Sequence, residues 1–173
     1  MHTIEKVTPE QAEQAQDELV ELLQDAVHNG ASVGFVSPLP REVARQYWHD
    51  VINDIRQGSR LLLLLRVSGR VVGSVQLDLC MRPNGTHRAE VQKLFVHTSV
   101  RRQGFGRAMM AAIEQEARNA RRSLLCLDTE SHKPAEVMYR RLGWFLVGEI
   151  PDYASSPDGH LRGTMIFYKK IGA

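Results

Sequence analysis

The stretch RRQGFGRAMM places two glycines one residue apart, behind two arginines and at the start of a run of helix-forming residues. The first turn of a helix has backbone N–H groups without partners and a partial positive charge, so it is a ready site for an anion such as a phosphate. Gly104 and Gly106 would let an anion approach the backbone closely, and the neighbouring arginines would bind its oxygens. A solvated basic helix cap explains the stretch equally well, so the flanking segments must decide.

The composition is that of a folded globular protein. Of the 173 residues, 43% are hydrophobic and 24% are charged, and a chain of this length can bury a substantial core. No apolar run approaches the roughly 20 residues that cross a bilayer, and the first residues lack the basic-then-apolar order of a signal peptide. We therefore expect one domain over residues 1–173, in the cytoplasm and without a membrane partner.

Charge is distributed unevenly along the chain. Residues 1–57 hold 4 Lys or Arg against 10 Asp or Glu, whereas residues 58–173 hold 18 against 10. We expect an anionic partner at the basic part, which contains the glycine stretch. Nucleic acid is disfavoured because the arginines are scattered and no series of base-stacking aromatic residues accompanies them.

The two cysteines, Cys80 and Cys126, lie inside apolar, strand-like runs. Neither has a second cysteine at the spacing of a metal site. We therefore expect both to be buried, reduced thiols and expect no metal.

Hydrophobic periodicity and turn residues predict the order of elements. The expected order is a strand at 2–8, helices at 9–30 and 41–58, antiparallel strands at 59–67, 70–80 and 88–97, a helix from 105, a strand at 122–129, a helix at 133–143, and strands at 144–150 and 163–171. This order excludes a dinucleotide-binding fold, whose glycine loop follows the first strand. The Gly-Lys-Ser/Thr sequence of a nucleotide-triphosphate loop is also missing at this stretch.

The segments around the glycine stretch resemble the GCN5-related N-acetyltransferase (GNAT) family. The family motif, Arg/Gln-x-x-Gly-x-Gly/Ala at a strand-to-helix junction, is matched by residues 101–106, with KLFV before it and AEVMYRRLGW after it. The resemblance implies the acyl-CoA N-acyltransferase fold, an α/β (α+β) fold in which helices flank a central, mixed, mostly antiparallel sheet. Three positions depart from the common pattern, since Thr98, Arg102 and His132 stand where many members carry Pro, Gly and Asn.

The resemblance implies acetyl-CoA (coenzyme A) as the cosubstrate. In the family the loop amides hold the pyrophosphate, and the preceding strand pairs its backbone with the pantetheine arm. Backbone N–H groups of that strand would also polarise the thioester carbonyl. The expected cofactor-binding residues are Leu94, Phe95, Val96, Arg101, Arg102, Gln103, Gly104, Phe105, Gly106 and Arg107.

Acetyl transfer from a thioester to an amine needs a neutral amine and a proton for the leaving thiolate. Tyr139 matches the family's tyrosine near the thioester sulfur and is the expected acid; packing in the core is the alternative. Glu90 begins one strand and Asp128 ends another. If these strands are neighbours, at least one carboxylate would act as the base, directly or through a water; solvated strand ends are the alternative.

Two loops are expected to form the walls of the acceptor site, because loops on a rigid scaffold commonly carry recognition. They are GASVGFVSPL, residues 30–39, and PDYASSPDGH, residues 151–160. Phe35, Glu130 and Tyr153 are the expected substrate-binding residues, with Glu130 as a substitute base, whereas Trp48 is expected in the core.

The sequence leaves three functions open. The first is transfer of an acetyl group from acetyl-CoA to a primary amine of a small molecule, by a monomer or homodimer; HNGASVGFVSPL and YASSPDGHL resemble members that detoxify an antimetabolite. The second is acetylation of a protein N-terminus or lysine, which predicts an open peptide groove instead of a loop-covered pocket. The third is a coenzyme A binding module without turnover.

Overall fold

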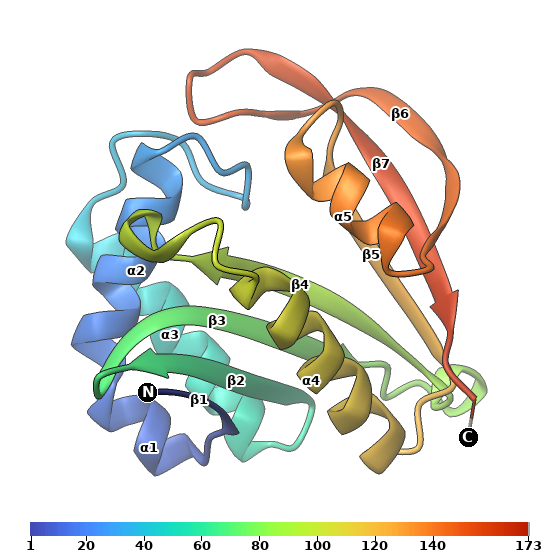
Figure 1. The fold of residues 1–173 in the computed structure, drawn as a ribbon, viewed down its shortest axis with the longest axis horizontal. Helices are drawn as coiled ribbons and strands as arrows, with labels where there is room; N and C mark the ends of the chain where they lie inside the picture. Colours follow the sequence, from blue (N-terminus) through green and yellow to red (C-terminus); the bar gives the residue numbers. More distant parts are fainter. Residues whose placement is uncertain (173) are drawn as a thin grey trace.

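The computed structural model describes residues 1–172. Within them, seven strands form one sheet with the order β1-β2-β3-β4-β5-β7-β6, and five α-helices cover its faces (Figure 1). All neighbouring strands are antiparallel except β4 and β5, which run parallel. The expected mixed, mostly antiparallel sheet flanked by helices is therefore confirmed. The elements are β1 His2–Lys6, α1 Pro9–Gln14, α2 Gln16–His28, α3 Arg41–Arg56, β2 Arg60–Val67, β3 Arg70–Leu79, β4 Arg88–Val96, α4 Phe105–Asn119, β5 Leu124–Glu130, α5 Pro134–Arg141, β6 Phe145–Ser155 and β7 Leu161–Lys170.

The single helix predicted over residues 9–30 is wrong, because two helices occupy this segment. Helix α1 begins with a capping box in which Thr8 and Gln11 bond to each other's backbone N–H groups, and the chain leaves helical geometry at Ala15. Ala12, Ala15 and Leu19 are all buried. Their helical spacing continues across the break, so the hydrophobic pattern gives no sign of it.

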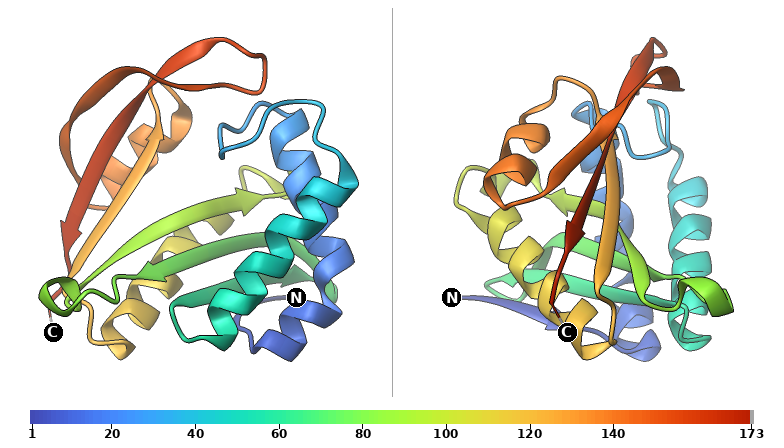
Figure 2. Two further views of the ribbon diagram at one scale, coloured as in Figure 1. Left: turned by 180° about the vertical axis from the view of Figure 1, so that it is seen from behind. Right: turned by 90° about the vertical axis from the view of Figure 1, so that its right-hand side faces the viewer.

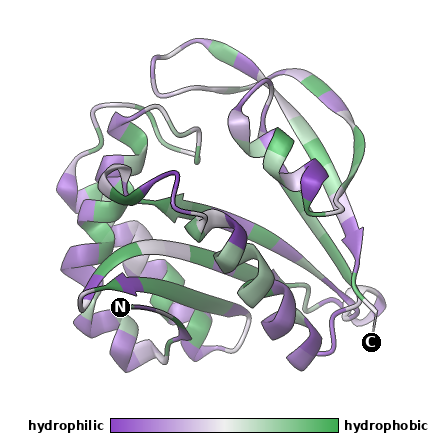
Figure 3. Cartoon of the chain, in the orientation of Figure 1, coloured by the Kyte–Doolittle hydropathy of each residue, from purple (hydrophilic) through white to green (hydrophobic). Residues whose placement is uncertain are grey.

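Two cores lie on opposite faces of the sheet (Figure 2). On β2, Leu62 and Leu64 pack toward α1, α2 and α3, whereas Leu63 and Leu65 pack toward α4. The strand alternates between two buried faces, which is why its sequence is a continuous apolar run, visible as green strands in Figure 3. Trp48 is completely buried in the first core, as expected.

Strands β4 and β5 pair over only three positions and then separate. Arg88–Glu90 pairs with Leu124–Cys126, and beyond this point the two strands diverge (Figures 1 and 2). In the same region β4 contains a bulge, because Gln76 pairs with Gln92 while Ser74 pairs with Phe95. From Val91 onward, β4 therefore has no described strand partner on its β5 side.

The cysteines are less buried than expected. Cys80 and Cys126 are free thiols, but both are half-exposed. Cys80 follows the last residue of β3, and Cys126 lies on the face of β5 opposite the core residues Leu125 and Leu127. An apolar run alone does not tell which face of a strand is covered.

Strand β6 forms the edge of the sheet beyond β7. Phe145, Val147 and Tyr153 are among its exposed large apolar side chains. Among residues 1–172, no helix combines the length and the apolar character needed to span a bilayer.

Candidate active site

The start of α4 is open to a ligand. Gly104 is the residue before the helix and has φ of +82°, and no side chain caps the first turn. A Cβ atom at Gly104 would find no other heavy atom within 4 Å. Arg101, Arg102 and Arg107 are exposed beside it. Free helix-start amides with basic side chains around them are the arrangement that suits a pyrophosphate.

The loop that leads into α4 is tied to α2. The backbone N–H and hydroxyl of Thr98 donate to the Asp25 carboxylate at 3.0 and 2.7 Å, and Nε of Arg101 donates to the Val96 carbonyl at 3.0 Å. Thr98, which replaces the common Pro, therefore contributes an N–H that Pro lacks. Asp25 was not predicted from the sequence, because 73 positions separate it from Thr98.

Two further departures from the family pattern have a backbone explanation. Arg102 has φ of +63° and His132 has φ of +62°. Gly and Asn are the residues that adopt this left-handed geometry most readily, which accounts for their frequency at these positions. His132 is exposed, in agreement with its expected place in a loop.

The expected pantetheine-binding segment of β4 coincides with the bulge and the separated strands. Leu94 and Val96 pack toward α4, whereas Phe95 is buried in the opposite core. The three side chains anchor the strand from both faces, and its backbone edge toward β5 has no described strand partner. Such an edge presents N–H and C=O groups to a ligand.

Tyr139 lies on α5, in the core on the α4 side of the sheet. Its side chain is only 7% exposed and packs against the rings of Trp144 and Phe167. Burial, and to a smaller extent the charge of Asp128, raises the pKa of Tyr139 to about 12. The residue is therefore a neutral phenol at every physiological pH, both as a packing residue and as a potential proton donor.

Glu90 and Asp128 lie on the same face of neighbouring strands. Glu90 pairs with Cys126, and Asp128 follows two residues later along β5, so the sheet geometry directs all three side chains to one side. Both carboxylates are exposed. Asp128 accepts a hydrogen bond from the Thr164 hydroxyl at 2.9 Å, and Glu90 accepts one from the Gln92 amide at 2.9 Å.

The two expected acceptor loops meet each other, but the expectation that residues 151–155 belong to the second loop is wrong, because strand β6 continues to Ser155. The Ser37 N–H donates to the Pro157 carbonyl at 3.1 Å, which joins the α2–α3 loop to the β6–β7 loop. In Figure 1 these loops lie on the same side of the separated strands. Phe35 in the first loop packs edge-to-face on Tyr47 of α3, with 5.3 Å between ring centroids.

The other expected substrate residues have different surroundings. Tyr153 is exposed on β6. Glu130 is buried, where it accepts a hydrogen bond from Ser156 and forms an ion pair with Lys133 at 3.1 Å. Through Ser156, Glu130 fixes the base of the β6–β7 loop to the end of β5.

The structure adds a charged residue that sequence reasoning missed. Lys93 is the bulge residue of β4, with φ of +52°, and its Nζ lies 3.5 Å from the place a Cβ would occupy on Gly34 in the α2–α3 loop. Burial lowers the pKa of Lys93, although Asp128 and Glu90 act in the opposite direction. The sequence predicts a regularly alternating strand here. It contains no sign of the bulge that turns the Lys93 side chain toward the α2–α3 loop.

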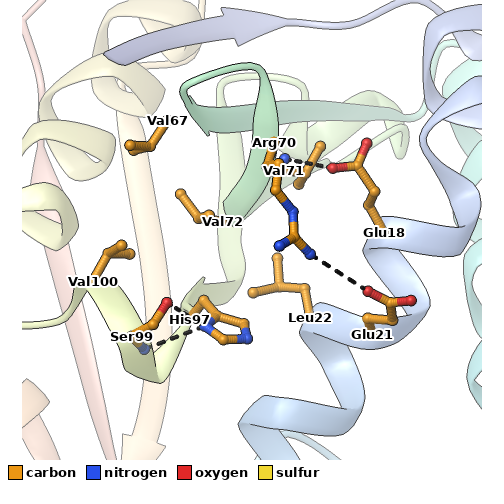
Figure 4. A pocket seen from close by; sticks show the side chains of 10 residues that line it. All are labelled: Glu18, Glu21, Leu22, Val67, Arg70, Val71, Val72, His97, Ser99 and Val100. Atoms are coloured by element: carbon orange, nitrogen blue, oxygen red, sulfur yellow. Dashed lines mark hydrogen bonds and ion pairs between the residues drawn. The ribbon is translucent and has the colours of Figure 1, made fainter. Parts of the chain in front are cut away.

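Two cavities border the region of the α4 start. One, of about 210 Å³, lies between α4 and α5 and includes Arg107, Val137 and Arg141 in its lining. The other, of about 230 Å³, lies between α2 and the β2–β3 turn and is shown in Figure 4. The second contains none of the expected site residues.

Comparisons with known proteins agree with this geometry. The model of the acetyltransferase (GNAT) family matches residues 17–144. An uncharacterized N-acetyltransferase from the hisH-hisA intergenic region of Azospirillum brasilense is 32% identical over 123 residues, which cover 68% of this chain and 71% of that protein.

Solved structures share the fold over nearly the whole chain. Ribosomal-protein-alanine N-acetyltransferase from Brucella melitensis has a TM-score of 0.78 and 23% identity, covering 98% of this chain and 99% of its own. A protein from Salmonella typhimurium assigned as an acetyltransferase, solved with its cofactor acetyl-CoA, has a TM-score of 0.79 and 15% identity. The match covers 100% of this chain and 95% of that chain. A protein assigned as a phosphinothricin N-acetyltransferase has a TM-score of 0.81 and 17% identity, and the match covers 100% of both chains.

Among residues 1–172, no three or more His, Cys, Asp or Glu side chains gather in a way that would hold a metal ion. The open helix start and the unpaired edge of β4 fit coenzyme A instead. Because the family model covers most of the chain, this protein belongs to the acetyltransferase (GNAT) family and is an acetyl-CoA-dependent acetyltransferase.

Proposed function

We propose that this protein transfers the acetyl group of acetyl-CoA to a primary amine of a small molecule. The observation that carries the proposal is the contact between the two acceptor loops, Ser37 N–H to the Pro157 carbonyl at 3.1 Å. The α2–α3 loop also lies next to Lys93, on whose charge Glu90 and Asp128 act. A joined pair of loops favours a compact acceptor, whereas an extended peptide would need an open groove.

The cosubstrate site follows from the open backbone groups. The amides at the start of α4, with Arg101, Arg102, Gln103 and Arg107 around them, would hold the pyrophosphate. The free edge of β4 at residues 94–96 would hold the pantetheine arm and direct N–H groups at the carbonyl of the acetyl group. When bound, acetyl-CoA supplies an activated acetyl group as a thioester.

Proton transfer would involve groups on both sides of the separated strands. Glu90 and Asp128 would attract the ammonium form of the acceptor, and one of them, directly or through a water, would remove its proton. The Tyr139 hydroxyl would donate a proton to the leaving thiolate, since its pKa of about 12 keeps it protonated. These roles place acid and base on opposite faces of β5.

The acceptor class is supported by four segments, two of which include the acceptor loops. The sequences HNGASVGFVSPL, RPNGTHRAEVQKL, LDTE and YASSPDGHL resemble the tabtoxin resistance protein, which acetylates the amine of a β-lactam antimetabolite. An amino-acid-like antimetabolite is therefore the acceptor class we favour, and antibiotic detoxification would be the biological outcome.

Acetylation of a panel of amines tests the proposal. The purified protein is incubated with acetyl-CoA and with small amines, amino acids, an alanine-terminated peptide and a lysine peptide, and thiol release is measured. We expect release with a small amine and little with peptides, and we expect a strong reduction in Tyr139→Phe. Efficient acetylation of the peptides alone, or binding of acetyl-CoA without turnover on any acceptor, would overturn the proposal.

A further inference from the structure

Lys93 carries a positive charge that forms no direct ion pair with a described acidic side chain. None of the ion pairs among residues 1–172 includes Lys93, and no hydrogen bond of its Nζ is found there. The side chain is nevertheless half-buried, and burial dominates the lowering of its pKa. Removing an ammonium group from water without a partner is unfavourable, so a partner supplied from outside the chain would be bound there.

The position of Lys93 places this charge on the acceptor side, by which we mean the region between the α2–α3 loop and the carboxylates Glu90 and Asp128. The bulge and the left-handed backbone at Lys93 interrupt the alternation of β4. Its Nζ consequently lies beneath the α2–α3 loop, 3.5 Å from the place a Cβ would occupy on Gly34. Glu90 and Asp128 are near enough for their charges to oppose the lowering of the Lys93 pKa.

The other cation of this region is already neutralised. Arg60, which also acts on Lys93, forms ion pairs with Asp54 and Asp78, both at 3.0 Å. Glu90 and Asp128, in contrast, accept hydrogen bonds only from uncharged groups among the described residues. This region therefore offers two carboxylates without a directly bonded cation and one ammonium group without a directly bonded anion.

We propose that Lys93 binds a carboxylate of the acceptor, so that the acceptor is an amino-acid-like zwitterion whose amine faces Glu90 and Asp128. A simple alkylamine would bond to the two acidic residues and leave Lys93 without a directly bonded anion. A zwitterion neutralises both sets of charges and is held in one orientation by two separated contacts. The inference rests on the proposed function, because it concerns the acceptor of that same reaction.

The test compares acceptors that differ only in the anionic group. The standard L-amino acids and their α-amides are assayed with acetyl-CoA, and kcat/KM is measured for wild type, Lys93→Met, Lys93→Arg and the control Lys170→Met, which changes an exposed lysine on β7. For the preferred amino acid, Lys93→Met is expected to lower kcat/KM by about 100-fold, mainly through KM. The α-amide is expected to keep its rate in the same variant.

The two remaining variants separate recognition from chemistry. Lys93→Arg keeps a cation that does not release its proton at neutral pH, so it should restore most of the preference for the acid if Lys93 binds a carboxylate. If it restores nothing, or if Lys93→Met lowers both acceptors equally while its melting temperature is unchanged, the inference is wrong. Equal kcat/KM of the wild type for the amino acid and its α-amide also overturns the inference and leaves the proposed function intact. If no small amine is acetylated at all, both the inference and the proposed function are wrong.

Discussion

Replacing Tyr139 by Phe removes one hydroxyl group and leaves the ring in place. The ring packs on Trp144 and Phe167, so Phe keeps these contacts and the fold should be retained. If the hydroxyl protonates the leaving thiolate, turnover should fall by about 10- to 1,000-fold, near the lower part of the range for a positioned general acid, with little change in acetyl-CoA affinity. Initial rates of thiol release and calorimetric titration with coenzyme A measure the two quantities.

The pH dependence adds a second, independent check. With a pKa of about 12 for Tyr139, only about 0.1% of the residue is ionised at pH 9. Wild-type kcat should therefore show no alkaline decline from this residue below about pH 10. Tyr168→Phe, at a half-buried tyrosine on β7, is the control. Unchanged turnover in Tyr139→Phe, or an alkaline decline near pH 8 that disappears in this variant, would refute the reasoning.

Three further predictions concern the cosubstrate loop and the carboxylates. Gly104→Val should weaken acetyl-CoA binding by at least about tenfold, whereas Gly58→Val, at a glycine with similar φ and equally open surroundings, should cost similar stability, about 1–3 kcal/mol, and leave binding unchanged in calorimetry. Glu90→Gln and Asp128→Asn should each reduce turnover, and the double variant should lose less turnover than the product of the two single losses. Raising the pH should partly restore the turnover of one single variant. Wild-type rates in both single variants would assign the base elsewhere. Arg102→Gly should raise the free energy of unfolding by up to about 1 kcal/mol, because Gly relieves the left-handed strain; a denaturation midpoint below wild type would contradict this.

The start of α4 after Gly104 could be predicted because its evidence is local. Gly104 lies next to the helix that it begins, and the surrounding residues combine a turn signal, a helical period and positive charge. The order of strands along the chain could be predicted for the same reason. Each strand is bounded by its own turn residues, such as Ser68 and Gly69 between β2 and β3.

The remaining site depends on contacts between distant segments. Asp25 supports the loop from 73 positions away, and Ser37 meets Pro157 across most of the chain. No local pattern encodes such pairs. The bulge at Lys93 was missed for a related reason, since it depends on the pairing of β4 with β3 and not on a turn residue in the sequence.

The short pairing between β4 and β5 divides the sheet into two parts, β1–β4 and β5, β7 and β6. Within residues 1–172, the strand pairing that joins β1–β4 to β5, β7 and β6 consists of Arg88–Glu90 with Leu124–Cys126, besides the side-chain core that both parts share. Segments with few shared bonds open as separate units in hydrogen exchange. A ligand that bonds to both edges would make them exchange together, and at a concentration 100 times its Kd it would add about 2.7 kcal/mol to the stability of the whole protein. Acetyl-CoA bound in this way would be a structural part of the sheet as well as a reactant, and the protein would then resist unfolding most strongly when it is ready to react.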